Sequence, residues 1–338
     1  MEFSIENSRI AWVDWAKSIS MFLVVLGHCH IRESEQFVIQ YIYSFHMMLF
    51  FFLSGLLCKR GLSVETFKKD FKYLILPYFT YGLVLVLFYF LRLRSFDYLL
   101  LLSKFIDLVV GLDAGIGPIW FLPALFLCKQ MYYFVKKVKN VNIVLYYVLV
   151  VFSLLGAYFI SSYNINSPLF SDSALCGLPF FIMGNESFLL WNKLSQYNIK
   201  LRLLLIFVLM LISVVLCYFN GFVVMANCLF GKSILLYYAN SLSAIASIIL
   251  LCALLESVQY RFVVVASRCS IVVLGIHSIP LIILNYYFPL LFGIEPSTYS
   301  FFMAFIYSVV VYVICYLFFV NIAVRYPIFW GVKGFEKK

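Results

Sequence analysis

Long apolar runs, nearly free of charged side chains, occupy most of this sequence. A helix needs about 20 apolar residues to cross the hydrocarbon core of a bilayer. The runs are continuous and do not alternate with polar residues, which excludes the strands of a membrane barrel. We therefore expect ten membrane helices, over roughly residues 10–30, 37–58, 73–91, 118–135, 141–160, 174–191, 203–219, 233–255, 270–292 and 301–323.

Composition supports a membrane protein. Hydrophobic residues make up 64% of the 338 residues and charged residues 12%, whereas a soluble domain is about half apolar and about a quarter charged. This excludes a soluble enzyme, a disordered chain and a nucleic-acid-binding protein. No polar stretch is long enough to form a separate domain, so we expect one all-α membrane domain over residues 1–338.

Charge and cysteine patterns refine this prediction. If the N-terminus lies inside, most of the 25 lysines and arginines fall on inner segments, so the positive-inside rule places both termini in the cytoplasm. The nine cysteines are scattered, without CxxC or other metal-ligand spacing, so we expect packing roles and no bound metal. The outer connection over residues 92–117 is amphipathic, and either lies on the outer leaflet or packs over the bundle.

The first apolar segment carries three ionisable side chains, which are costly inside a membrane. Lys17 and His28 are eleven residues apart, which at about 100° per residue leaves a difference of only about 20°. Asp14 falls on the same stripe, three residues before Lys17. The structural alternative is an Asp–Lys pair and a histidine near the outer surface, but three such residues on one face favour a functional site.

Two more histidines lie within apolar segments. His46 and His277 are each as compatible with a structural role as with a functional one, whereas His30 lies beyond the helix end and is expected to be solvated. Ser54-Gly55 is typical of close helix packing. Pro77 indicates a kink or a freed carbonyl in the third segment, and Trp120 fits an interfacial anchor.

Together these blocks resemble acyltransferase family 3, the integral membrane proteins that acetylate surface polysaccharides and related glycans. The resemblance covers nearly the whole chain. Its motifs are Arg9 with Trp12-Val13-Asp14-Trp15-Ala16-Lys17 and Gly27-His28; Ser44-Phe45-His46-Met47 with Ser54-Gly55; Lys69-x-x-Lys72 with Leu76-Pro77-Tyr78; Trp120-Phe121-Leu122-Pro123; and Ser270 with His277.

The resemblance implies transfer of an acetyl group from acetyl-CoA to a hydroxyl of a surface polysaccharide or lipid-linked sugar, in a bacterial-type inner or plasma membrane and in contact with its lipids. His28 would act as a general base or a transient acetyl carrier. The residues implied are His28, His46, Asp14 and Lys17 for catalysis; Arg9, Lys69, Lys72, Tyr78 and Ser54 for the donor; and Trp120, Ser270 and His277 for the acceptor.

Two features depart from the family pattern. Lysines stand before Pro77, where arginine is commoner, which weakens the case for bidentate phosphate contacts. Residues 271–276 lack the tyrosine often found before the histidine. The alternative functions are a lipid-linked glycan flippase or polysaccharide polymerase, and a non-enzymatic membrane sensor.

Overall fold

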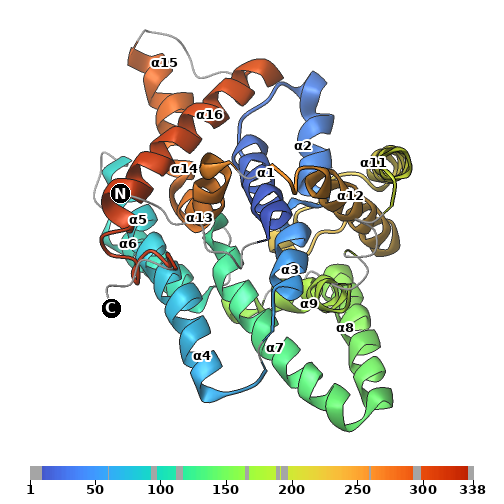
Figure 1. The fold of residues 1–338 in the computed structure, drawn as a ribbon. Helices are drawn as coiled ribbons and strands as arrows, with labels where there is room; N and C mark the ends of the chain where they lie inside the picture. The colour runs from blue at the N-terminus through green and yellow to red at the C-terminus, as the bar shows by residue number, and fades with distance from the viewer. Residues whose placement is uncertain are drawn as a thin grey trace.

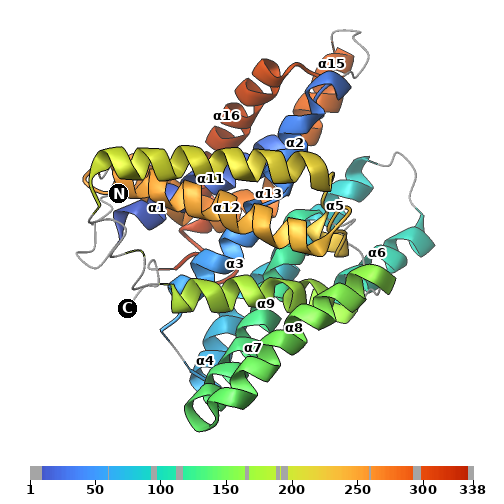
Figure 2. The ribbon, with the colours of Figure 1, turned by 90° about the vertical axis from the view of Figure 1, so that its right-hand side faces the viewer.

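The computed structural model is built of helices (Figures 1 and 2). It describes residues 10–59, 61–92, 97–111, 117–163, 167–187, 191, 197–258, 260–291 and 298–333. Within these ranges the only β-pairing consists of two isolated bridges, Ile31 with Tyr299 and Val224 with Leu229. The all-α class predicted from the sequence is confirmed.

All ten predicted apolar segments contain helix. The main helices are α1 (Ala11–Gly27), α2 (Gln36–Tyr43), α3 (His46–Leu56), α4 (Val64–Asp70), α5 (Leu76–Arg92), α6 (Tyr98–Val110), α7 (Phe121–Val141), α8 (Ile143–Tyr163), α9 (Ser171–Glu186), α11 (Ile199–Asn220), α12 (Ile234–Leu254), α13 (Arg261–Ile276), α14 (Ser278–Ile282), α15 (Phe288–Leu291) and α16 (Phe301–Phe318). Short helical turns join several of them.

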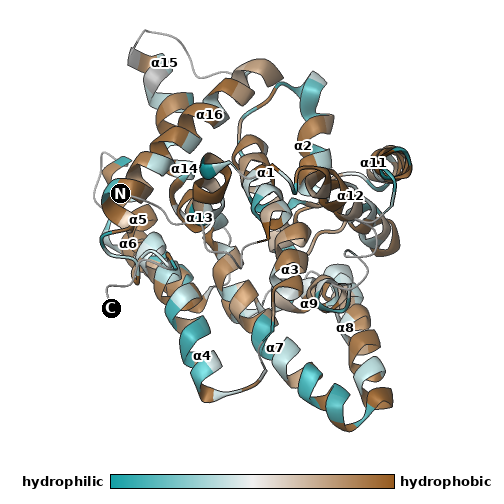
Figure 3. Cartoon of the chain, in the orientation of Figure 1, coloured by the Kyte–Doolittle hydropathy of each residue, from teal (hydrophilic) through white to brown (hydrophobic). Residues whose placement is uncertain are grey.

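Among the described residues, six helical stretches are long and apolar enough to cross a membrane, and a bent pair makes up to seven. The pair is α13 and α14 with its continuation, bent by 59°. The remaining predicted crossings correspond to α1 and α9, which have 17 and 16 residues, and to α7, whose second half is rich in lysine. Hydrophilic residues gather on α4 and the far end of α7 (Figure 3).

Helix α1 lies in the middle of the bundle (Figure 1). It packs against α13, α12, α16 and α3. Asp14 on this helix is only 4% exposed, so the polar face of α1 is turned into protein. The fold thus buries Asp14 of the predicted stripe and leaves Lys17 and His28 half-buried.

Helices α3 and α9 meet at very close range. A Cβ atom added to Gly55 would overlap the carbonyl of Phe181, and one added to Gly184 would overlap the carbonyl of Phe52. Asn185 fixes the same contact by donating its Nδ2 to the carbonyl of Gly55 at 2.9 Å. Small residues are used in this way to let membrane helices approach, and the packing role predicted for Ser54-Gly55 is confirmed.

The predicted amphipathic helix of the outer connection is α6, and it packs on α5. Tyr78 donates its hydroxyl to the carbonyl of Leu108 at 2.8 Å, and Leu108 is the one buried residue of α6. Asp97 caps the helix by accepting from the backbone N–H of Leu99 and Leu100. The face of α6 that carries Leu108 therefore packs over the bundle, which is one of the two predicted placements. The opposite face of α6 is exposed and apolar.

Candidate active site

Two interruptions of helix bring three histidines together. His28 follows the last residue of α1, His46 begins α3 directly after a break in the second segment, and His277 lies at the bend between α13 and α14. The rings of His28 and His277 have centroids 5.0 Å apart in an edge-on arrangement. The ring of Tyr43 contacts both His28 and His46, with ring centroids 6.0 and 5.2 Å apart, respectively.

All three imidazoles are held in the same way. In each, Nδ1 lies 2.7–2.8 Å from the backbone carbonyl four residues earlier. A carbonyl can only accept, so Nδ1 carries the proton and Nε2 of the neutral ring has a free lone pair. Nε2 of His277 is buried and has no hydrogen-bond partner. The arrangement offers unprotonated ring nitrogens for proton abstraction or nucleophilic attack.

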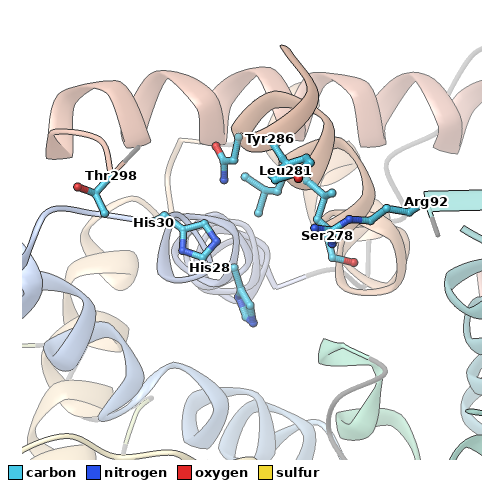
Figure 4. A pocket seen from close by; sticks show the side chains of 9 residues that line it. His28, His30, Arg92, Ser278, Leu281, Tyr286 and Thr298 are labelled. Carbon is cyan, nitrogen blue, oxygen red and sulfur yellow. The ribbon is translucent and has the colours of Figure 1, made fainter. Parts of the chain in front are cut away.

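A cavity of about 410 Å³ opens beside His28 (Figure 4). Its size falls within the range of about 300–1,000 Å³ typical of small-molecule sites. Buried polar atoms without partners include Oγ of Ser278 and Oδ1 of Asn285, and both side chains line the cavity. The described lining residues are His28, His30, Arg92, Ser278, Leu281, Ile282, Asn285, Tyr286 and Thr298.

A second group of polar residues lies at the other end of α1, around Asp70 at the end of α4. Lys129 of α7 forms an ion pair with Asp70, and Tyr133 donates its hydroxyl to the same carboxylate at 2.8 Å. Lys72 and Lys333 both lie over the ring of Tyr73, with Nζ atoms 5.5 and 5.2 Å from its centroid. Cations from three distant parts of the chain therefore converge here.

The pKa of Lys333 reflects this surrounding. Removal of water by the packed chain and repulsion from Lys129 and Lys17 lower the pKa of Lys333 to about 8, although Asp70 opposes the change. The side chain keeps an exposed surface, which limits the contribution of desolvation and leaves the neighbouring cations as the firmer cause. The site is thus short of negative charge.

The predicted residues separate into three sets. His28, His46 and His277 come together near the cavity. The group of cations around Asp70 and Lys333, which we call the basic end, includes Lys17, Lys69 and Lys72. Trp120 packs against Phe121 and Phe170, and the Ser270 hydroxyl donates to the carbonyl of Ala266 within its own helix. Neither is among the described residues that line the 410 Å³ cavity.

The remaining predicted donor residues are Tyr78, Ser54 and Arg9. The hydroxyl of Tyr78 is used by α6, and Ser54 lies next to the close contact of α3 with α9. Arg9 lies outside the described residues.

Several residues of both sites were not predicted from the sequence. Arg92, Ser278, Asn285 and Lys333 were not singled out, and His30 was expected to be merely solvated although it lines the cavity. One signal was available, because Pro280 follows His277 by three residues and proline interrupts the helix before it. Asn285 lies in a π-helical turn, η7 (Ile283–Tyr287), a feature frequent at functional sites.

A model of the acyltransferase domain family matches residues 10–320. The match covers most of the chain, which therefore belongs to acyltransferase family 3, as its motifs predict. A search of curated proteins and a search of solved structures each gave no significant match. The protein is thus a membrane acyltransferase by family and by its apolar helices.

Proposed function

We propose that the protein transfers an acetyl group from acetyl-CoA to a hydroxyl of a cell-surface glycan or its lipid-linked precursor. In this proposal the chain crosses a bacterial-type cell membrane ten times, with both termini in the cytoplasm. The observation that carries it is the meeting of the His28 and His277 rings beside a polar-lined cavity. Lys17 lies on the same helix as His28, about 16 Å away along its axis.

The basic end suits the donor. Coenzyme A carries several phosphate charges, and cations concentrated in one place attract such an anion. That charge comes from α4, the π-helical turn that follows it, α7 and the final segment, through Lys69, Lys72, Lys129 and Lys333. Because α1 links this end to His28, the pantetheine arm would extend alongside this helix to bring the thioester to the imidazole.

The neutral tautomer of His28, with its proton on Nδ1, allows the acetyl transfer to be catalysed by Nε2. Its Nε2 removes the proton of the acceptor hydroxyl as the oxygen attacks the thioester carbonyl. The new ester C–O bond forms as the C–S bond breaks, and the proton passes from Nε2 to the departing thiolate. In a second course, Nε2 attacks the thioester carbonyl, forming an N–C bond as the C–S bond breaks and the CoA thiolate leaves. The acceptor oxygen then attacks the acetyl carbon, the N–C bond breaks, and the hydroxyl proton passes to the thiolate.

The hydrogen bonds from Nδ1 to backbone carbonyls also limit what His46 and His277 can do. Neutral His46 has its N–H engaged by the carbonyl of Ile42, so it stabilises an oxyanion only when it is doubly protonated. His277 is better suited to accept a hydrogen bond from the acceptor through its unpartnered Nε2. Asp14 and Lys17 would position α1 and supply positive potential toward the donor.

The test is transfer of labelled acetyl from acetyl-CoA to a lipid-linked oligosaccharide extract by the purified protein in proteoliposomes. His28→Gln keeps an amide of similar reach but no basic nitrogen, and we expect transfer to fall by about a hundredfold or more. Its unfolding temperature in detergent serves as the folding control. Transfer that persists in a folded His28→Gln protein would remove His28 from the chemistry.

A further inference from the structure

We propose that the outer cavity recognises an anionic group on the acceptor, held by Arg92 beside the hydroxyl that reacts. The inference rests on the proposed function and deepens it, because it names a charge that the acceptor must carry. It starts from the composition of the cavity wall. Arg92 is the one formally charged side chain among the described lining residues, and no Asp or Glu is among them.

Arg92 is an exposed residue at the end of α5, and a contact with an aromatic ring holds it toward the cavity. Its guanidinium lies over the Tyr286 ring, 5.0 Å from the centroid, and Tyr286 itself lines the cavity. Figure 4 shows the side chain reaching from the end of α5 toward Ser278. Within the described ranges no carboxylate forms an ion pair with it. A cation–π contact orients a guanidinium but does not neutralise it, so the charge remains for a ligand.

The neighbouring part of the cavity wall supplies groups that can pair with hydroxyls. Asn285 is 8% exposed, and its Oδ1 has no partner. The Ser278 hydroxyl is likewise buried and unpartnered. Leaving such groups unpaired costs free energy comparable to a lost hydrogen bond, and a bound polyol satisfies both. The cavity thus combines a cation, two positions for hydroxyl groups and the imidazoles of His28 and His277.

Guanidinium binds phosphate and carboxylate oxygens through paired N–H donors. Two acceptors provide such an anion: a sugar attached to a diphosphate lipid carrier, and an acidic sugar bearing a carboxylate. Both present the negative group a short distance from sugar hydroxyls, which matches a cavity with Arg92 on one wall and His28 on another. The shared requirement is an anion, and the probes below separate its sources.

Binding is measured on the full-length protein in detergent, with inorganic pyrophosphate and farnesyl diphosphate as one arm and glucuronate as the other. Saturating CoA is present throughout, so that the basic end is occupied. We expect one arm to bind the wild type, and Arg92→Gln to weaken that binding by about tenfold or more. Arg32→Gln is the matched control, because Arg32 is exposed and does not line the cavity.

Each outcome decides the inference. Loss of binding in Arg92→Gln but not in Arg32→Gln supports it, and the arm that binds identifies phosphate or carboxylate. Equal binding to all three proteins, or no binding of any probe to the wild type, overturns it. Because binding is measured without turnover, failure of acetyl transfer with intact Arg92-dependent binding would refute the proposed function and leave the anion site standing. Acetylation of neutral glycans alone, unaffected by Arg92→Gln, would refute the anion site and leave the transferase standing.

Discussion

Lys333 gives the basic end a measurable dependence on pH. With a pKa of about 8, about 90% of this side chain is protonated at pH 7 and about 10% at pH 9. The sign follows from the charge, since only the ammonium form attracts phosphate. If the donor requires that form, its dissociation constant should therefore rise by up to about tenfold between pH 7 and pH 9.

The assay is equilibrium binding of CoA to the detergent-solubilised protein over this pH range. Lys333→Gln should bind more weakly at pH 7 and lose most of the rise toward pH 9. Lys232→Gln is the control, because Lys232 is an exposed residue outside the basic end. A wild-type affinity that stays constant from pH 7 to pH 9, or a Lys333→Gln protein with the wild-type slope, would refute the assignment of Lys333 to the donor site.

Two further predictions concern the imidazole site and the helix contact that supports it. His277→Phe removes the unpartnered Nε2, so we expect acetyl transfer to fall by at least about tenfold, with a larger rise in KM for the acceptor than for acetyl-CoA; equal KM values would contradict the acceptor role. Gly55→Ala forces a Cβ into the Phe181 carbonyl and should destabilise the protein by about 1–3 kcal/mol. Gly61→Ala meets open space and should not, so equal unfolding temperatures in detergent would contradict the close contact.

Much of the helical content was predictable because apolar length is set by the bilayer. The runs 141–160, 203–219 and 233–255 correspond to α8, α11 and α12 with small shifts at their ends. The breaks were not predictable from length alone. The chain is apolar on both sides of Phe45 and of His277, so hydropathy continues where the helix does not.

The candidate site was predictable only where its residues share an element. Lys17 lies in α1 and His28 directly follows its last residue, so helical periodicity alone relates the two. Arg92 and Asn285 are separated by nearly two hundred residues, and nothing in either local sequence indicates that the two face one cavity. Lys333 likewise reaches the basic end because the final segment folds back, as the bond from the Tyr81 hydroxyl to the Trp330 carbonyl shows.

The bend at His277 separates α13 from the part of the chain that begins at Ser278, and the two parts contribute different groups to the cavity region. The ring nitrogen of His277 is anchored to Val273 in α13, whereas Ser278, Asn285 and Tyr286 lie beyond the bend. Substitutions or small tilts in the half beyond the bend would therefore reshape this wall of the cavity while the imidazole keeps its place. Under the proposed function, such a division lets related proteins change the acceptor they bind without rebuilding the imidazole site.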